Sequence, residues 1–314
     1  MTIVSAPGKI HLMGEHAVVY GRPALLAAIN RRLTVSVQKG THGVKIISDQ
    51  PGAYVRHIVS LVLKELKIAG EPDAIISIFS DIPAGFHLGS SAAVAVATIG
   101  ALSYFLKRIW NPIAINKLAF EAEKQQHGNP SGGDNTIVTF GGIVWYRREL
   151  EFLKSIWQLS FHPHKSLSQF FLINTGKPKE STRDMVAFVK SEVENPKTSG
   201  EMERALNENE TQTRRIAAAL KEGSEEMLIG AMRAGEQTLE RMHVVSDTVL
   251  PFIRGIEKAG GAAKILGGGG RIGAVGYLLT YLPEEKRVQE LSETYHYEAE
   301  QITLGEEGVR LDEK

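Results

Sequence analysis

Apolar and polar residues alternate in short runs through the first part of the chain, a pattern typical of strands. Alternating or β-branched residues predict four strands, at 2–6, 33–37, 44–47 and 75–79. Between the last two, residues 54–68 carry apolar side chains at helical spacing, and Gly70 ends this predicted helix. The chain therefore begins with strands and helices mixed.

A long uncharged segment from Leu88 to Leu106 has the length of a membrane-spanning helix. It is rich in Ala, Gly, Ser and Thr, and it opens with a Gly-Ser-Ser turn. Small residues permit close packing on a sheet, so we predict a buried helix from Ser90 instead of a membrane span.

The mixture of strands and helices continues to the end of the chain. After Asn111-Pro112 the spacing predicts a helix over 113–126, and residues 136–147 predict two short strands around a Gly-Gly pair. The segment FFLINT, which starts at Phe170, predicts a strand, and long helical stretches follow at roughly 181–193, 200–221, 224–242 and 245–259. Without regular βαβ alternation this order predicts an α+β fold with two lobes, 1–160 and 161–314.

Composition narrows the classes of function. The 314 residues include 36 basic and 36 acidic side chains, and this balance predicts no long-range attraction to nucleic acid or to an anionic membrane. The chain has no cysteine, which excludes disulfides, thiolate metal sites and cysteine nucleophiles. The first residues lack a basic region followed by a long apolar core, so we expect no signal peptide and a cytoplasmic protein.

The first segment that could carry chemistry is PAGFHLGSSAAVAVA, residues 83–97. Gly85 and Gly89 flank a turn, and Ser90 and Ser91 stand where the Ala-rich helix begins. Unpaired N–H groups and the helix dipole favour an anion there, glycines let a phosphate approach, and the serines can cap the helix or hold a metal. No lysine precedes the serines, so this is not a P-loop, and alone the segment fits an N-capped core helix slightly better.

A second candidate is HGNPSGGDN, residues 127–135. Two clusters of turn-forming residues would hold Asp134 rigidly before a strand, where a carboxylate can act as a general base toward an alcohol. A surface loop is commoner for such a composition. Upstream, Glu123 could hold Mg²⁺ together with Ser91, since Mg²⁺ takes few protein oxygens, although most helix glutamates are simply solvated.

Two further stretches complete the set. Residues 7–25 cluster Lys9, Glu15 and His16 between glycines and prolines, and a lysine there could pair with a phosphate or with Asp134. A strand–turn–strand with exposed charges explains the same residues equally well. The run GGGG at 267–270 fits a backbone that approaches a phosphate, but a plain turn is the commoner explanation.

These segments, together and in this order, resemble the GHMP kinases. PGKIHLMGEHAVVYG resembles that superfamily's first motif, PAGFHLGSSAA its phosphate-binding second motif, and NKLAFEAEKQQHGNPSGGDN the segment with the catalytic Asp and a metal-binding Glu. NTGKPKESTRDMV resembles the substrate-side stretch, and KILGGGG the start of the third motif. Five motifs in the right order, from residue 3 to about residue 280, make the resemblance specific.

The resemblance implies both a fold and a reaction. The fold is the two-lobed GHMP kinase fold, with a ribosomal-protein-S5-like N-terminal lobe and a ferredoxin-like C-terminal lobe. The reaction is transfer of the ATP γ-phosphoryl group to a substrate hydroxyl with Mg²⁺. GEHAVVYG and HGNPSG are similar to the mevalonate kinase form, which implies the C5 hydroxyl of mevalonate as acceptor and 5-phosphomevalonate as product, in isoprenoid biosynthesis. By analogy with the family we also expect a homodimer.

The resemblance further implies a set of site residues. Asp134 would orient or deprotonate the hydroxyl, and Lys9 would bind the transferred group and favour the ionised form of Asp134. Ser91 and Glu123 would hold Mg²⁺. The substrate side would contain Glu15, His16 and Thr182. ATP would be bound by the second motif, namely Pro83, Gly85, Leu88, Gly89, Ser90, Ser91 and Ala92.

The chain departs from the family in two places, and two alternatives stay open. Phe86-His87 stands where the second motif usually has small residues, and LGGGGRIG brings Arg271 to the third motif. We expect the Arg271 side chain to point into solvent. One alternative is another GHMP small-molecule kinase, such as a sugar kinase or a mevalonate 3-kinase. The other is a non-catalytic homologue that binds nucleotide, against which the presence of the predicted catalytic residues argues.

Overall fold

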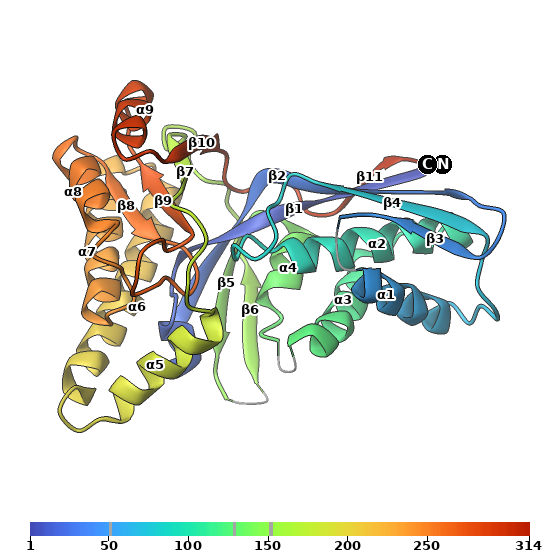
Figure 1. The fold of residues 1–314 in the computed structure, drawn as a ribbon, viewed down its shortest axis with the longest axis horizontal. Coiled ribbons are helices and arrows are strands. Elements are labelled where there is room, and N and C mark those ends of the chain that lie inside the picture. Colours follow the sequence, from blue (N-terminus) through green and yellow to red (C-terminus); the bar gives the residue numbers. More distant parts are fainter. Residues whose placement is uncertain (50–51, 128–129, 151–152) are drawn as a thin grey trace. The chain divides into compact units, whose positions relative to one another are not determined.

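A computed structural model describes residues 1–49, 52–127, 130–150 and 153–314 of the chain. The chain forms two compact units, each built from separate stretches (Figure 1). Unit 1 contains Met1–Lys9, Ala28–Gly142 and Gly305–Lys314, and unit 2 contains Ile10–Ala27 and Ile143–Leu304. Residues 10–27 thus group with the second half of the chain. The predicted lobe boundary at residues 160 and 161 stays a prediction.

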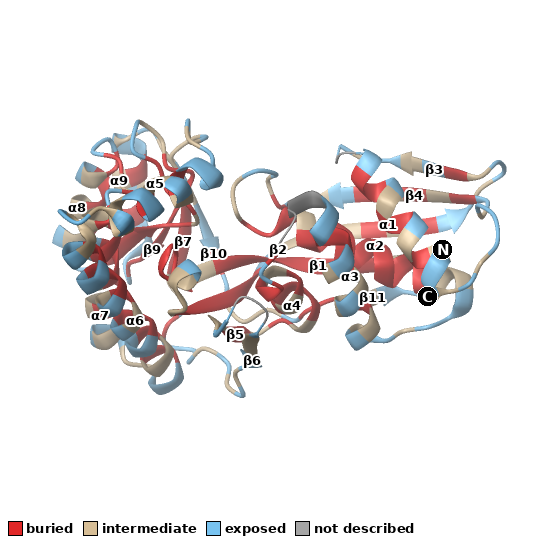
Figure 2. Ribbon diagram, turned by 90° about the horizontal axis from the view of Figure 1, so that it is seen from below, coloured by how far each residue is buried: buried red, intermediate tan, exposed pale blue. Residues whose placement is uncertain are grey.

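Unit 1 contains most of a mixed sheet whose strands follow the order β11-β1-β2-β4-β3. These strands are β1 (Thr2–Met13), β2 (Pro23–Lys39), β3 (Val44–Ile47), β4 (Ala74–Ser80) and β11 (Arg310–Glu313). The helices of this unit are α1 (Gly52–Glu65), α2 (Ser90–Lys107), α3 (Pro112–His127) and α4 (Gly133–Phe140). Helices α1, α2 and α3 lie against one face of the sheet, and α2 is buried along most of its length (Figure 2).

Unit 2 contains a second, antiparallel sheet in the order β10-β7-β9-β8. Its strands are β7 (Phe170–Asn174), β8 (Ala262–Ile265), β9 (Tyr277–Tyr281) and β10 (Glu298–Ile302). Its helices are α5 (Thr182–Glu194), α6 (Ser199–Glu222), α7 (Glu225–Arg241), α8 (Leu250–Lys258) and α9 (Glu285–Thr294), with a short 3₁₀ helix η1 (Ala17–Tyr20). The start of β2 also pairs with β5 (Ile143–Arg148), which pairs with β6 (Lys154–Gln158).

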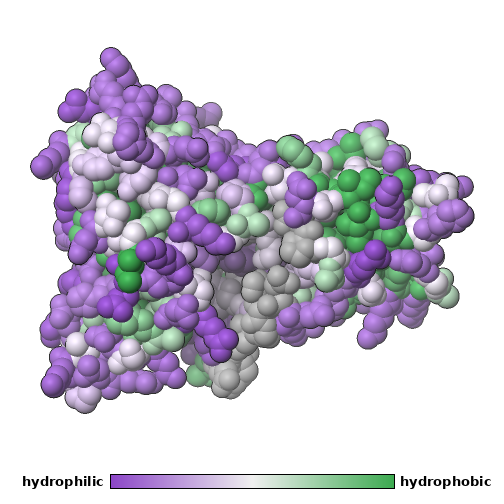
Figure 3. Space-filling view, viewed as in Figure 1, coloured by the Kyte–Doolittle hydropathy of each residue, from purple (hydrophilic) through white to green (hydrophobic). Residues whose placement is uncertain are grey.

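Apolar packing explains why these elements form. In unit 2 one buried cluster joins Phe171 of β7 and Phe252 of α8 to apolar residues of α5, α6, β8 and β9. The outward faces of the same helices are mostly hydrophilic, as the space-filling view shows (Figure 3). Helices with one apolar and one polar face gain most of their stability from such packing.

The predicted buried helix is confirmed in α2. Among the described residues, α2 is the helix that is long enough and apolar enough to cross a membrane. However, 72 % of that stretch lies buried inside the protein. Ala93, Ala97 and Ala101 are fully buried. Their small side chains let the helix approach its neighbours closely, which is the behaviour of a core helix.

One predicted strand is wrong. Residues 136–140 belong to helix α4, and only the second predicted strand forms, as β5. Local β-branched content favoured a strand, but Ile137 and Val138 are buried where α4 packs against α2 and α3, so tertiary packing overrides that preference. Gly141 and Gly142, with φ angles of 70° and 71°, then end the helix. Asp134 therefore lies in the first turn of a helix and not before a strand.

The α+β fold class is confirmed by these two sheets and their helices. The strands predicted at 2–6 and 33–37 are parts of longer strands, and helix α8 begins at Leu250, later than predicted. The C-terminal residues return to unit 1, where Gly141 forms a β-bridge with Glu307.

Candidate active site

The turn before helix α2 is shaped by left-handed backbone conformations. Gly85, His87 and Gly89 have φ angles of 84°, 62° and 80°. Gly89 is the N-cap of α2 and offers no side-chain cap, so the first N–H groups of the helix keep their hydrogen-bonding capacity. A Cβ atom at Gly89 would lie 2.7 Å from Cγ of Lys9, so only glycine lets the start of α2 approach this lysine.

The remaining predicted ATP-binding residues lie in the same turn and helix start. The backbone N–H of Lys9 donates to the carbonyl oxygen of Leu88 at 2.9 Å. Leu88, Ser90 and Ala92 are buried, and the Ser90 hydroxyl has no hydrogen-bond partner among the described residues. Pro83 and Gly85 lie earlier in the turn, where Gly85 is exposed. The strand that carries Lys9 is thus joined to the start of α2.

Lys9 and Asp134 form an ion pair. Nζ of Lys9 lies 3.0 Å from Oδ2 of Asp134. The lysine side chain is 3 % exposed and the aspartate side chain 35 % exposed, so the pair is buried on the side of β1 and open on the side of α4. The αL conformation of Gly132, the N-cap of α4, places Asp134 in the first turn of that helix. Lys9 and Asp134 are far apart in the sequence, and they meet in the fold as predicted.

Ser91 and Glu123 also meet. Oγ of Ser91 donates to Oε1 of Glu123 at 3.3 Å. Burial, and then the charge of Asp134, raise the pKa of the Glu123 carboxyl, while the Ser91 bond and the charge of Lys9 oppose this. A buried carboxylate whose negative charge is poorly balanced by its neighbours is suited to bind a cation, since a bound cation would stabilise its charged form. Glu123 and Ser91 thus suit a metal, and the Glu123 carboxyl interacts electrostatically with Lys9 and Asp134.

Two residues that the sequence did not assign lie near this cluster. Burial, and then the charge of Lys9, lower the pKa of His87, and Asp134 opposes this, so the ring lies close to both members of the ion pair. Tyr54 of α1 is buried, its hydroxyl has no partner among the described residues, and burial followed by the charge of Glu123 raises its pKa. His87 was visible as a departure from the family. Tyr54 gave no signal, because its spacing marks only an apolar helix face.

The predicted substrate-side residues His16 and Thr182 meet in unit 2, at Gly268. Nε2 of His16 lies 3.0 Å from the carbonyl oxygen of Gly268, and it donates in this bond because a carbonyl only accepts. Thr182 is the first residue of α5, and a Cβ atom at Gly268 would lie 3.1 Å from its Cα. Ser181 caps α5 through a reciprocal capping box with Asp184. The glycine run therefore lies against both predicted residues.

Glu15 has a partner that the sequence did not reveal. It is buried, and its Oε1 accepts a hydrogen bond from Nζ of Lys264 in β8, which is fully buried. A lysine within the apolar strand before GGGG was the available signal. A direct contact between Glu15 and substrate stays a prediction.

Arg271 follows the glycine run and is exposed. Its guanidinium lies 4.0 Å from the centre of the Phe188 ring, and its backbone N–H donates to Glu180 at 3.3 Å. The expected outward orientation is consistent with this exposure.

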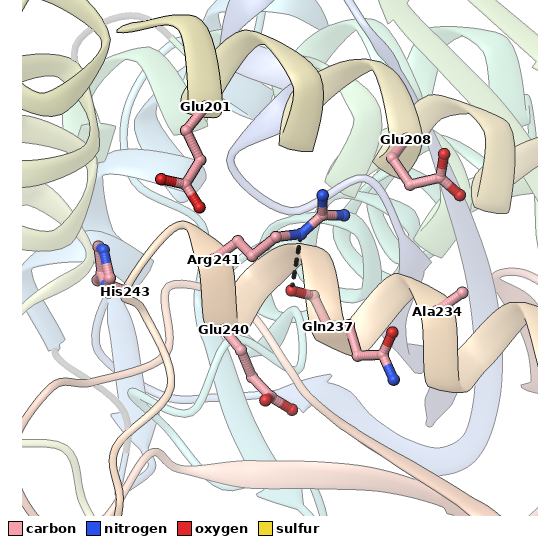
Figure 4. A pocket seen from close by; sticks show the side chains of 7 residues that line it. All are labelled: Glu201, Glu208, Ala234, Gln237, Glu240, Arg241 and His243. Atoms are coloured by element: carbon pink, nitrogen blue, oxygen red, sulfur yellow. Dashed lines mark hydrogen bonds between the residues drawn. The ribbon is translucent and has the colours of Figure 1, made fainter. Parts of the chain in front are cut away.

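A pocket of unit 2 is lined by none of the residues named above. Helices α6 and α7 line it with Glu201, Glu208, Ala234, Gln237, Glu240 and Arg241, and His243 follows α7 (Figure 4). Its three carboxylates would repel a triphosphate, so charge excludes it as the ATP site although it is an open concavity.

Comparison with known proteins agrees with the geometry. Residues 53–142 match the family described as the GHMP kinases N terminal domain, and residues 2–39 match the galactokinase galactose-binding signature. With the glycine-rich start of α2 beside the Lys9–Asp134 pair, this match defines an ATP-dependent kinase of the GHMP class. A mevalonate kinase from Archaeoglobus fulgidus is 36 % identical over 275 residues, which are 85 % of this chain and 89 % of that protein. The chain belongs to the mevalonate kinase family.

Solved structures agree on the fold. The mevalonate kinase of Methanococcus jannaschii superposes with a TM-score of 0.81 at 21 % identity, covering 96 % of this chain and 98 % of that chain. The mevalonate kinase of L. major in complex with R-mevalonate gives a TM-score of 0.79 at 22 % identity, covering 97 % and 96 %. At these identities the likeness shows the GHMP kinase fold and not the substrate.

Proposed function

We propose that the protein transfers the γ-phosphoryl group of ATP to the C5 hydroxyl of mevalonate, which yields 5-phosphomevalonate. The observation that carries the proposal is the Lys9–Asp134 ion pair beside the glycine-bounded start of α2, in a chain of the mevalonate kinase family. Phosphoryl transfer needs positioning and charge neutralisation more than covalent chemistry, and these residues offer both.

Asp134 would act on the hydroxyl. Its Oδ2 is fixed by Lys9, and its partial exposure leaves the carboxylate accessible to a substrate alcohol. It would orient that alcohol or accept its proton. The ammonium group of Lys9 would also bind the transferred phosphoryl group and neutralise charge that develops there.

The turn before α2 would bind the triphosphate. Gly85 and Gly89 let the phosphates approach the backbone, and the first N–H groups of α2 would donate to them. Ser90 adds a buried hydroxyl without a partner among the described residues. The other residues proposed for this task are Pro83, Leu88, Ser91 and Ala92.

Mg²⁺ would be held by Ser91 and Glu123. The 3.3 Å contact between their oxygens and the poorly compensated burial of Glu123 fit a hard cation that takes few protein ligands. When bound, Mg²⁺ neutralises charge on the phosphate oxygens. No cluster of three or more His, Cys, Asp or Glu side chains occurs in the part of the chain that the structure describes, so waters and phosphates would complete the coordination.

The substrate side would be formed by His16 and Thr182, which both lie at Gly268, with Glu15 next to His16 in sequence. We further propose that the enzyme is cytoplasmic, where ATP is supplied, and that it forms a homodimer. Sedimentation velocity of the full chain tests the homodimer, and a monomer at micromolar concentration would contradict it.

The decisive experiment is ATP consumption with a panel of alcohols, followed by identification of the product by NMR. We expect turnover with R-mevalonate and a phosphate on C5. The match to a galactose-binding signature makes a sugar kinase the second candidate, so galactose and other hexoses belong in the panel. Turnover of a hexose but not of mevalonate would overturn the proposal, as would phosphorylation at C3. Nucleotide binding without any turnover would indicate a non-catalytic homologue.

A further inference from the structure

Three ionisable side chains from distant parts of the chain meet inside unit 2. Lys264 of β8 and Glu236 of α7 are fully buried, and Glu15 is nearly so. Nζ of Lys264 donates to Oε1 of Glu15, across a separation of 249 residues.

The same side chains hold the backbone at the start of the glycine run. Nζ of Lys264 donates to the carbonyl oxygen of Ile265 at 2.7 Å, and the N–H of Ile265 donates to Oε2 of Glu236 at 3.0 Å. Both backbone groups of this residue are therefore fixed by buried side chains. Further along, His16 binds the Gly268 carbonyl, and the N–H of Gly270 donates to Val244 at 3.0 Å.

The arrangement links two predicted parts of the site. Glu15 and His16 are neighbours in one tight turn, so the Glu15–Lys264 bond and the His16–Gly268 bond tie this turn to both ends of the segment 264–268. Thr182 lies against the same glycine. A shift of β8 relative to the turn would therefore displace His16, Gly268 and Thr182 together.

Stability alone does not account for this network. Buried ion pairs lose hydration that their attraction often fails to repay, and replacement of a whole pair by apolar side chains is frequently neutral or stabilising. Glu236 adds a second buried carboxyl beside a single lysine, with Oε1 lacking a partner among the described residues. Such groups are best explained by what they hold in place.

We propose that Lys264 and Glu236 are positioning residues: they fix the Glu15–His16 turn and the glycine run 267–270 in the geometry that receives the acceptor substrate. Glu15 then contributes to substrate binding through its bond with Lys264, in place of the direct substrate contact predicted from the sequence. This inference deepens the proposed function and rests on it for the identity of the acceptor.

The test separates positioning from stability. Lys264→Met alone would leave the Glu15 carboxylate buried without this partner and would strongly destabilise the fold, so the main variant combines Lys264→Met with Glu15→Met. We expect its melting temperature to stay near that of the parent or to exceed it. We expect kcat/KM for mevalonate to fall by about 10²-fold, the scale of a small misplacement of substrate-positioning groups. ATP affinity, measured without mevalonate, should change less than about threefold.

The matched control is Lys190→Met with Glu194→Met, which removes an exposed Lys–Glu pair on α5 of the same unit. It should keep the parent's kcat/KM. A folded Lys264→Met/Glu15→Met variant with parental kcat/KM would overturn the proposal. If the double variant does not fold, Glu236→Gln serves instead, since it keeps the shape and the bond from Ile265; unchanged kcat/KM in that variant would overturn the role of Glu236.

A second measurement does not depend on activity. Amide hydrogen exchange of residues 265–270 should be faster in the folded double variant than in the parent and unchanged in the control, because the backbone of Ile265 loses one of its buried anchors. Unchanged exchange there would contradict the positioning role. If the parent fails to phosphorylate mevalonate while the exchange result holds, the proposed function fails and the positioning role stands.

Discussion

At the scale of single residues, the Lys9–Asp134 contact carries the proposed chemistry of unit 1. The ammonium group fixes one carboxylate oxygen at 3.0 Å while the aspartate stays partly open. A general base needs this combination of a defined position and access to its substrate. Because Lys9 also lies against Gly89 and Leu88, the same side chain connects the base to the proposed phosphate site.

Asp134→Asn should lower kcat by about 10²–10⁴-fold, because it keeps the shape of the side chain but removes the base and its charge. ATP binding should change little. Steady-state kinetics and calorimetry measure the two effects, and Glu121→Gln, an exposed glutamate paired with Lys124, is the control. An Asp134→Asn enzyme that retains most of its kcat would show that another group serves as base.

Glu123→Gln should raise the Mg²⁺ concentration needed for half-maximal rate more than it changes KM for mevalonate. The amide keeps an oxygen near Ser91 but loses the charge that would attract the cation. Titration of the rate with Mg²⁺, and of Mn²⁺ binding by EPR with ATP present, measures this. Identical titration curves for variant and parent would refute a metal-binding role.

Glu236 makes stability depend on pH. Burial raises its pKa to about 8 from 4.5; Lys264 and the Ile265 N–H oppose this, and Glu240 and Glu15 add to it. The native state therefore binds this proton more tightly than the unfolded chain. Between about pH 4.5 and 8 its contribution to the free energy of unfolding falls as pH rises, by at most about 1.4 kcal/mol per pH unit. Glu236→Gln removes this slope.

The stability of Glu236→Gln relative to the parent should accordingly be higher at pH 8 than at pH 5. Urea unfolding at the two pH values measures the difference between the proteins, so that titrations common to both cancel. A difference that does not change with pH would mean that Glu236 carries no proton in the native protein at neutral pH.

At the scale of elements, the sequence predicted what local patterns determine. Helix α2 and the strands around it follow from the spacing of apolar residues. The order of the motifs singled out Lys9, Ser91, Glu123 and Asp134, which meet in the fold as two pairs. The strand predicted at residues 136–140 was wrong because packing against α2 and α3, and not local propensity, decides that these residues form a helix. Lys264 and Glu236 stayed hidden because Glu15 lies 249 residues from Lys264, and Ile265 lies 29 residues from Glu236, and no local pattern encodes such pairings.

Gly89→Ala tests how tightly α2 must approach β1. The residue has a φ angle of 80°, and an added Cβ atom would lie 2.7 Å from the Lys9 side chain. We expect a loss of stability of about 1–3 kcal/mol and a higher KM for ATP. Gly70→Ala is the matched control, since Gly70 also has a φ of 80° but open space around it. Equal losses in both variants, with ATP affinity intact, would mean that only backbone strain matters.

At the scale of the whole molecule, the proposed ligands divide between the two units. The triphosphate residues and the base belong to unit 1, whereas His16 and Thr182 belong to unit 2. The chain enters unit 2 directly after Lys9, within β1, so one strand carries groups for both tasks.

This division predicts separate footprints for the two substrates in amide hydrogen exchange. The first N–H groups of α2, at Ser90 to Ala92, have no side-chain cap, and their exchange should slow when phosphate oxygens accept from them. ATP with Mg²⁺ should therefore protect residues 90–92, and mevalonate alone should protect segments 16–18 and 181–184. The amides of Glu225 and Glu226, in the first turn of α7, are the control and should not respond.

Fast-exchange NMR on the full chain measures all of these amides. Protection of 181–184 by ATP without any change at 90–92 would contradict the assignment of the triphosphate to unit 1.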